Sequence, residues 1–156
     1  FSMNSLDRRL LEILQKDART PIARLSEEAN ASTASVQRRL KKMREDGTII
    51  SENVVIDQEK AGFDVTAIIS VDLERDRIDE IDAFKRRAKM NSQVQHCYCV
   101  AGDCDFVLVV IAKSIKDYEA FTHQFFFKDT SVRRFRTSIV VSREKTTTYV
   151  PLQETV

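Results

Sequence analysis

One stretch of the sequence carries side chains suited to reading DNA. In residues 32–45, STASVQRRLKKMRE, three apolar residues recur at the spacing of one helix face: Val36, Leu40 and Met43. If that face is buried, the other side chains point outward. Glutamine and arginine can form paired hydrogen bonds to purines, small residues allow close approach to base edges, and lysines neutralise phosphates. The candidate DNA-binding residues are Ser32, Thr33, Ala34, Ser35, Gln37, Arg38, Lys41 and Lys42.

The distribution of charge favours DNA binding over an ordinary solvated helix face. The chain carries 25 basic and 24 acidic residues, which excludes binding to nucleic acid by bulk charge. Residues 1–50, however, carry ten basic and seven acidic side chains, so positive charge is concentrated in the first third. Arg39 lies beside the apolar stripe, and we interpret it as a structural or phosphate-facing residue.

Two further short helices are predicted before this one. Apolar residues share one helix face in each: Leu6, Leu10, Ile13 and Leu14 in the first, then Ile22, Leu25 and Ala29 in the second. Three such helices, with a short turn before the third, are typical of a helix-turn-helix DNA-binding domain.

The helix ends are marked by residues with capping preferences. Pro21 suits a first helical position behind a Thr20 cap, and Asn30 suits a left-handed exit. Ser32 can cap the third helix, and Gly47 ends it.

The pattern changes after Gly47 from helical spacing to strand-like alternation. TIISENVVID indicates a short extended connection or wing, and Gly62 marks a turn. The remaining segments predict the order strand, helix, strand, strand, helix, strand, which is ferredoxin-like. They are VTAIISVDL, RIDEIDAFKRRAKM, VQHCYCVA, DFVLVVIA, IKDYEAFTHQFFF and VRRFRTSIVVSRE.

The predicted fold is therefore α+β with two domains. We expect a winged helix-turn-helix domain at residues 1–50, a linker strand or hinge at 51–62 and a ferredoxin-like domain at 63–156. Two crossover helices would cover one sheet face and leave the other bare. Because VLVVIA and IVV are apolar throughout, we expect a dimer joined through that bare face.

Two carboxylates stand where the second and third strands turn round, in VAGDCDFVLVV, residues 100–110. Gly102 and Asp103 could simply form a tight turn, since both tolerate positive φ. Asp105 begins an apolar strand and needs a partner: a ligand, a backbone amide, or a cation such as Arg134 or Arg136.

Other classes of function find little support in the residues. Cys97, Cys99 and Cys104 are too few and too bunched for a disulfide framework, and His96 is placed opposite the first two, so we expect reduced thiols and no metal site. A role of these thiols in redox or cysteine sensing stays open. No nucleophile pair or phosphate loop indicates an enzyme. Without a signal or membrane-spanning segment, we expect a cytoplasmic protein with no membrane partner.

Over nearly its whole length the chain resembles the Lrp/AsnC family of feast/famine transcription regulators. The resemblance rests on LDRRLLEILQKDAR, LSEEANASTASVQRRLKKMREDGTII, VAGDCDFVLVV and RTSIVVSRE together. It implies a regulator of amino-acid metabolism or transport that reads a roughly palindromic operator. The alternative is a stand-alone amino-acid-sensing module that does not bind DNA.

The resemblance also implies dimers that assemble into tetramers or octamers, an amino-acid effector and no other cofactor. It places the effector in a cleft bordered by Val100, Ala101, Gly102, Asp103, Asp105, Phe135 and Thr137. The chain departs from the family pattern at Thr130 and Ser131, where many relatives have Pro-Gly, and at Phe135, where many have threonine. Phe135 could fill space that an effector needs.

Overall fold

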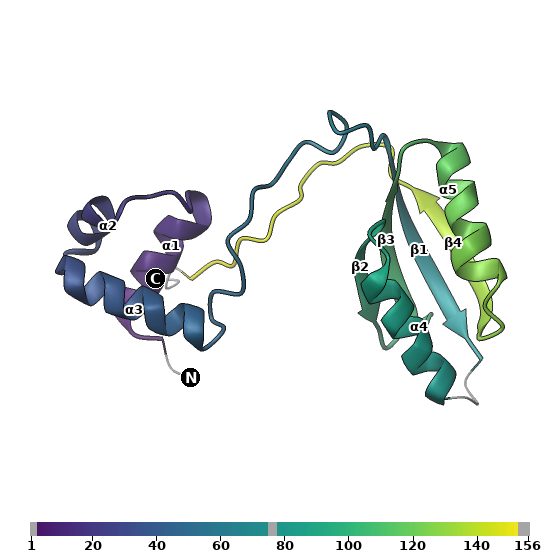
Figure 1. Cartoon of the computed structure of the whole chain (residues 1–156), viewed down its shortest axis with the longest axis horizontal. Coiled ribbons are helices and arrows are strands. Elements are labelled where there is room, and N and C mark those ends of the chain that lie inside the picture. Colours follow the sequence, from purple (N-terminus) through teal and green to yellow (C-terminus); the bar gives the residue numbers. More distant parts are fainter. Residues whose placement is uncertain (1–2, 75–77, 153–156) are drawn as a thin grey trace. The chain divides into compact units, whose positions relative to one another are not determined.

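The computed structural model describes residues 3–74 and 78–152, which form two compact units (Figure 1). The N-terminal unit contains the residues up to Val55 together with those from Lys145 onward. The second unit spans Ile56–Glu144.

The N-terminal unit is built from three helices, as predicted. They are α1 (Ser5–Lys16), α2 (Ile22–Ala29) and α3 (Thr33–Glu45). Their apolar faces meet in one buried core made of Leu10, Leu11, Leu25, Val36, Leu40 and Met43. These three helices and their common core confirm the helix-turn-helix prediction. Helices of this length are stable because they bury their apolar faces against each other.

Most of the predicted helix ends are confirmed. Asn30 ends α2 with left-handed dihedrals (φ 51°, ψ 51°), and the Ser32 hydroxyl caps α3. Gly47 has φ +80° just beyond α3. The prediction for Pro21 is wrong: Pro21 is itself the N-cap, and the Thr20 hydroxyl donates to the Asp17 carbonyl oxygen (2.7 Å), because Asp17 to Thr20 form their own turn.

The segment between α3 and the first strand is an extended connection. Residues 48–64 contain no strand, and Ile50, Val54 and Val55 are almost fully exposed. The expected wing is therefore absent from this stretch, because no neighbouring segment supplies the backbone hydrogen bonds that a β-ribbon requires.

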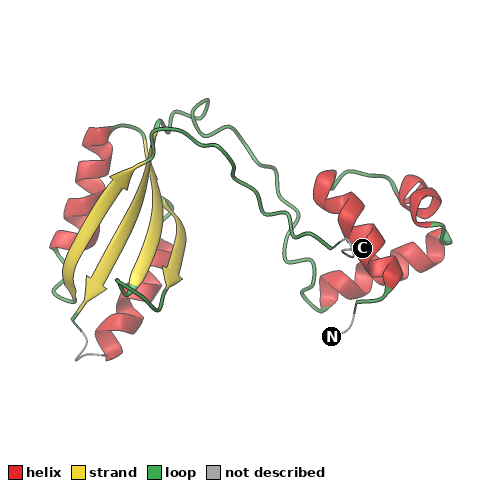
Figure 2. Cartoon of the chain, turned by 180° about the vertical axis from the view of Figure 1, so that it is seen from behind, coloured by secondary structure: helices red, strands yellow, loops and turns green. Residues whose placement is uncertain are grey.

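The second unit has the predicted ferredoxin-like order. Its elements are β1 (Val65–Leu73), α4 (Ile78–Met90), β2 (Val94–Cys99), β3 (Phe106–Ala112), α5 (Ile115–Thr122), a π-helical turn η1 (His123–Phe127) and β4 (Val132–Ile139). The strands pair antiparallel in the order β2-β3-β1-β4. Both helices lie on the same face of the sheet (Figure 2).

Alternation along the strands separates a buried face from an open one. Val65, Ala67, Ile69 and Val71 of β1 are buried with the helices, whereas Ile68 on the opposite face is 42% exposed. Val107, Val109 and Ile111 of β3 lie on the same open face and are half-buried. The strand expected through Val141 ends at Ile139, and Val141 is 97% exposed, so burial of this end on both faces is not seen within the described residues of one chain.

The C-terminal boundary differs from the expected one. Residues 145–152, here called the C-terminal strap, were expected in the ferredoxin-like domain but belong to the N-terminal unit. They do so because their backbone hydrogen-bonds to side chains of α1. The expected linker is also divided, with residues up to Val55 in one unit and Ile56 onward in the other. Residues 153–156 lie outside the described part.

Candidate nucleic-acid interface and effector site

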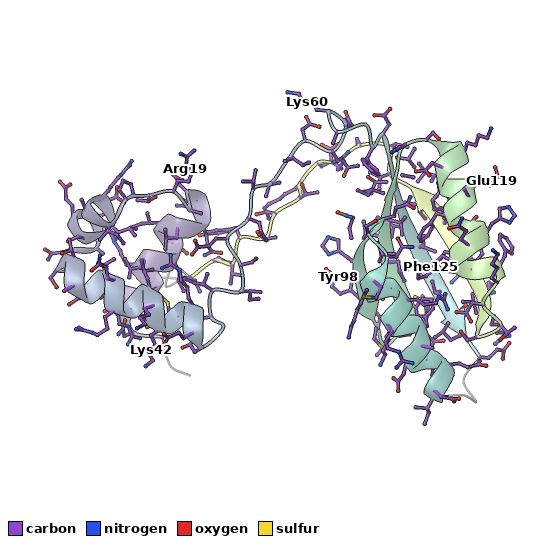
Figure 3. The ribbon with its side chains drawn as sticks, in the orientation of Figure 1. Arg19, Lys42, Lys60, Tyr98, Glu119 and Phe125 are labelled. Atoms are coloured by element: carbon purple, nitrogen blue, oxygen red, sulfur yellow. The ribbon has the colours of Figure 1, made fainter. Side chains whose placement is uncertain are left out.

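The eight candidate DNA-binding residues lie on α3 or at its N-cap. Val36, Leu40 and Met43 are buried in the core, so the opposite side of the helix faces outward. Seven of the eight candidates are exposed, and Ser35 is half-buried. Lys42 points outward from α3 (Figure 3). The structure thus brings together on one surface the set that the helical spacing selected.

The first turn of α3 is held by a small hydroxyl network. The Ser32 hydroxyl accepts from the Ser35 backbone amide (3.1 Å) and donates to the Ser35 hydroxyl (2.9 Å). Arg38 Nη2 donates to the same Ser35 oxygen (3.4 Å), which holds the guanidinium near the start of the helix. Lys41 lies 3.9 Å from Glu45 in an exposed ion pair, which water screens strongly and which leaves the ammonium accessible.

Of the two roles expected for Arg39, structural or phosphate-facing, the structure shows a structural one. Arg39 Nε donates to Asp7 Oδ1 (2.7 Å) and Nη2 to Oδ2 (2.5 Å), so α3 is fastened to α1 by a two-point ion pair. Asp7 is fully buried, and its carboxylate also accepts from the Asn4 amide at the α1 N-cap. The hydrogen bonds from Arg39, above all other causes, hold the pKa of Asp7 below its usual value.

Asp7 was not among the candidates from sequence. A signal exists in retrospect: position 7 falls on the core side of α1, one residue after Leu6, where an unpaired carboxylate would be costly. Sequence spacing alone does not identify the cation that meets it, because Arg39 is 32 residues away.

Asp105, directly before β3, has backbone partners in β1. Its backbone amide donates to the Val71 carbonyl (3.0 Å), and its Oδ2 accepts from the Leu73 amide (2.9 Å). Of the partners considered, the structure supplies a backbone amide. Asp105 therefore fastens the hairpin to the end of β1, where the β1–β4 register shifts between Asp72 and Leu73.

The tip of the hairpin is exposed, and its backbone does not need the left-handed dihedrals that favour glycine. Ala101, Gly102 and Asp103 are exposed, and Val100 is half-buried. Gly102 and Asp103 do not have positive φ, which removes the reason expected for a glycine in this turn. Asp103 presents its carboxylate to solvent, in contrast to Asp105.

Phe135 and Thr137 lie on the helix-facing side of β4. Phe135 pairs with Val71 across the sheet, in the row to which Asp105 bonds, and Thr137 pairs with Ile69 one step further. The Phe135 ring stacks on Phe126 at 4.3 Å between centroids. Thr137 shares a hydrogen bond with the Tyr118 hydroxyl. Phe135 thus fills space beneath η1 in its own chain.

The departure at Thr130 and Ser131 also has a structural account. Ser131 is buried, and both its amide (2.8 Å) and its hydroxyl (2.5 Å) donate to Asp129 Oδ1. Asp129 in turn is paired with Arg87 of α4, which also donates to the Phe125 carbonyl (2.6 Å). These contacts fix the turn into β4 without proline or glycine.

The three cysteines are free thiols. Cys97 and Cys99 share one face of β2, as predicted, and their register with β3 makes it the helix-facing one. Burial raises the pKa of Cys97. His96 lies on the other face, with Nδ1 3.2 Å from the Tyr98 hydroxyl. In the described ranges, no three His, Cys, Asp or Glu side chains are grouped as a metal site would require.

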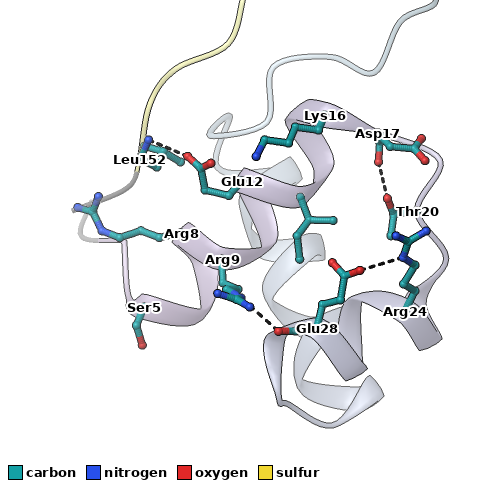
Figure 4. A pocket seen from close by; sticks show the side chains of 11 residues that line it. Ser5, Arg8, Arg9, Glu12, Lys16, Asp17, Thr20, Arg24, Glu28 and Leu152 are labelled. Carbon is teal, nitrogen blue, oxygen red and sulfur yellow. Dashed lines mark hydrogen bonds and ion pairs between the residues drawn. The ribbon is translucent and has the colours of Figure 1, made fainter. Parts of the chain in front are cut away.

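A groove on the N-terminal unit was not anticipated from sequence. It has a volume of about 720 Å³ and lies between α1, α2 and the strap (Figure 4). Arg9 and Arg24 along it both bond to Glu28, through its carbonyl (3.2 Å) and its carboxylate (2.9 Å) respectively. Arg24 and Glu28 form an ion pair within the groove, and the candidate DNA-binding residues lie outside it, on α3 and at its N-cap.

A helix-turn-helix unit with an exposed polar reading helix, joined to a ferredoxin-like unit, defines a two-domain DNA-binding regulator. Two family models match the chain: the AsnC-type helix-turn-helix domain over residues 3–44 and the Lrp/AsnC ligand binding domain over residues 66–150. The chain belongs to the Lrp/AsnC family and is a DNA-binding transcriptional regulator. The match to the helix-turn-helix model favours this function over a sensing module without DNA binding.

Known proteins are similar over nearly the whole chain. An uncharacterised HTH-type transcriptional regulator of Sinorhizobium fredii is 36% identical over 153 residues, 98% of this chain and 90% of that protein. An AsnC family regulator from Agrobacterium tumefaciens has a TM-score of 0.90 and 31% identity, covering 96% of this chain and 97% of its own. A Neisseria meningitidis regulator solved with L-Met shares the fold, with a TM-score of 0.91 and 22% identity over 97% of both chains.

No helix in residues 3–74 or 78–152 is long and apolar enough to span a membrane.

Proposed function

We propose that the protein reads a roughly palindromic operator as a dimer and that a small amino acid alters this binding. Its targets would be genes of amino-acid metabolism or transport, and it would act in the cytoplasm. The observation that supports DNA reading most directly is the gathering of all eight candidates on α3 and its cap, opposite the buried stripe.

Within this surface we assign different roles to different residues. Gln37 and Arg38 are exposed on the outward side and have the paired donors and acceptors that recognise purines. Thr33 and Ala34, at the start of α3, are small enough to allow close approach to the bases. Lys41 and Lys42 would neutralise phosphates, which position the protein without reading sequence.

Replacing Arg38 by alanine tests this assignment. We expect Arg38→Ala to weaken binding to the specific operator by about 1–3 kcal/mol while binding to unrelated duplex changes little. Fluorescence anisotropy with the gene's own upstream region and a scrambled duplex measures both. Lys41→Ala is the matched comparison and should weaken both duplexes equally. An equal loss for Arg38→Ala on both would make it a phosphate contact instead.

We propose that dimers form through the open face of the sheet. Ile68, Val107, Val109 and Ile111 form a continuous apolar strip across its two central strands, β1 and β3. A second copy would cover this strip and place two reading helices on one side of the duplex. Assembly of dimers into tetramers or octamers would follow the family pattern.

For the effector we propose an amino acid near the hairpin tip. Asp103 can accept hydrogen bonds from an ammonium group, and the backbone amides of the exposed residues Ala101 and Gly102 can donate to a carboxylate. Val100 would border the same site, while Asp105 would hold the hairpin in place. Phe135 and Thr137, which pair with Val71 and Ile69 of β1, would shape the site from β4. The L-Met bound by the Neisseria regulator supports this class of ligand.

The hairpin assignment predicts a defined loss. In a thermal-shift screen of the amino acids, we expect the ligand that raises the thermal midpoint of the wild type to leave that of Asp103→Ala unchanged. The ammonium group of the ligand would have no carboxylate partner in this variant. DNA binding without ligand should be unchanged. Asp64→Ala, another exposed carboxylate of the second unit, should respond like the wild type. A normal response of Asp103→Ala would contradict the assignment.

A further inference from the structure

The strap is bound to one face of α1 by specific hydrogen bonds. Glu12 accepts from the Tyr149 hydroxyl through Oε2 (2.7 Å) and from the Leu152 amide through Oε1 (2.8 Å; Figure 4). The Tyr149 hydroxyl and then the Leu152 amide lower the pKa of Glu12, and the carboxylate raises that of Tyr149. The contact is therefore made by the ionised carboxylate.

A second α1 side chain completes the contact. The Gln15 amide group accepts from the Val150 amide (2.7 Å) and donates to the Val150 carbonyl (3.0 Å), as an adjacent β-strand would. Glu12 and Gln15 are three residues apart and so lie on the same side of the helix. The Leu152 side chain packs against the helix core. Two polar side chains and one apolar anchor thus recognise an extended peptide.

This contact attaches the DNA-reading unit to the rest of the chain at two points. The chain leaves the N-terminal unit after Val55 and returns to it at Lys145, after β4. Residues 48–57 and 141–148 have no helix or strand, and most of them are exposed, so each connection alone would be a pliable linker. Fixing the returning segment on α1 removes conformational freedom that a unit on one linker would keep.

We propose that Glu12, Gln15 and Tyr149 are positioning residues that restrain the DNA-reading unit and thereby set the half-site spacing that a dimer accepts. The inference rests on the proposed function, in which two units bind one operator. When two modules are joined, the second binding event depends on how well the connection matches the distance between sites. A restrained pair accepts few spacings, whereas a pair on loose linkers accepts many.

The test compares full-length wild type with the double variant Glu12→Ala/Gln15→Ala on palindromes with different spacings. One duplex keeps the natural spacing, and another separates the half-sites by about five more base pairs, half a helical turn. We expect the wild type to lose about tenfold or more in affinity on the second duplex, and the double variant to lose less than about threefold. Equal losses for both proteins would overturn the role in spacing.

Two matched variants exclude other causes. Removing a carboxylate from the DNA-reading unit could strengthen phosphate binding generally, so Glu27→Ala, an exposed residue of α2 outside the strap contact, serves as the charge control. It should keep the wild-type dependence on spacing. Tyr149→Phe, which loses only the hydroxyl that bonds to Glu12, should have a smaller effect than the double variant.

A measurement without DNA tests independently whether the strap restrains the N-terminal unit. Nitrogen-15 relaxation on the full chain reports the tumbling of each unit, and the N-terminal unit should tumble faster in the double variant than in the wild type. Unchanged tumbling would show that the strap does not restrain the unit. If the wild type failed to bind any duplex, the proposed function would fall, while this comparison would still decide the restraint.

Discussion

Replacing Asp7 by alanine is expected to lower the stability of the N-terminal unit by about 3 kcal/mol, because the change leaves Arg39 without its buried partner. Asp7 is fully buried, and the Arg39 side chain is only 18% exposed, so water replaces the lost contact poorly. The same change removes half of the α1 capping box, in which Asn4 and Asp7 bond reciprocally. In a unit of this size the thermal midpoint should fall by roughly 10 °C or more.

The dependence on pH separates the ion pair from simple packing. Because the pKa of Asp7 is lowered in the folded state, its stabilising contribution is present above about pH 4 and is lost as the pH falls through the folded-state value. The difference in stability between wild type and Asp7→Asn should therefore shrink between neutral pH and pH 3. Urea titrations followed by circular dichroism at several pH values measure it.

Two controls belong to this experiment. Glu27→Ala changes a carboxylate that is exposed in the same unit, and the stability of this variant should stay within about 0.5 kcal/mol of the wild type. Arg39→Lys keeps the charge but not the two-point geometry and should be intermediate. A difference between wild type and Asp7→Asn that did not depend on pH would argue against the ion pair as the cause.

The second large effect is expected at the open face of the sheet. Val109→Asp places a carboxylate at the centre of the apolar strip, where a second copy would bury it without a partner. We expect the dimer to weaken by at least about a hundredfold, an estimate that corresponds to roughly 3 kcal/mol. Sedimentation at micromolar concentration should then show a monomer, and affinity for the palindrome should fall with it.

The folded state of the single chain should survive this change, because Val109 faces away from the helix-covered core. Circular dichroism and the thermal midpoint of the second unit check this point. Lys116→Asp introduces the same side chain at an exposed position of α5 and should leave the dimer intact. A Val109→Asp protein that remained dimeric would place the interface elsewhere on the molecule.

Local patterns predicted the elements well because their causes are local. Spacing of apolar residues defined the three helices, and Asn30 and Ser32 ended or began helices through short-range backbone and hydroxyl contacts. Apolar runs and changes of periodicity predicted the order of strands and helices along the second unit. The wing predicted after Gly47 is absent from residues 48–64. A strand forms only when a second segment pairs with its backbone, and the alternation of residues in one segment does not show whether such a partner exists.

What the sequence did not reveal depends on contacts far apart in the chain. The strap contains no apolar periodicity, and its bonds to α1 span 135 to 140 residues. The direction of Phe135 likewise follows from its register with β1 and from the π-helical turn above it. The candidate DNA-binding residues could be selected from sequence because they all lie on one helix or at its N-cap, whereas the proposed effector residues come from strand β4 and the β2–β3 hairpin.

The conformation of Gly102 determines which side chains the hairpin tip can accept. Its φ is not positive, and no heavy atom lies within 4 Å of the position where a Cβ would be placed. A larger side chain at this position would meet no steric penalty in the single chain, while Asp105 would continue to fasten the hairpin. If the tip holds the effector as proposed, a side chain added at Gly102 could change the chemistry offered to the ligand while the fold of the single chain is kept.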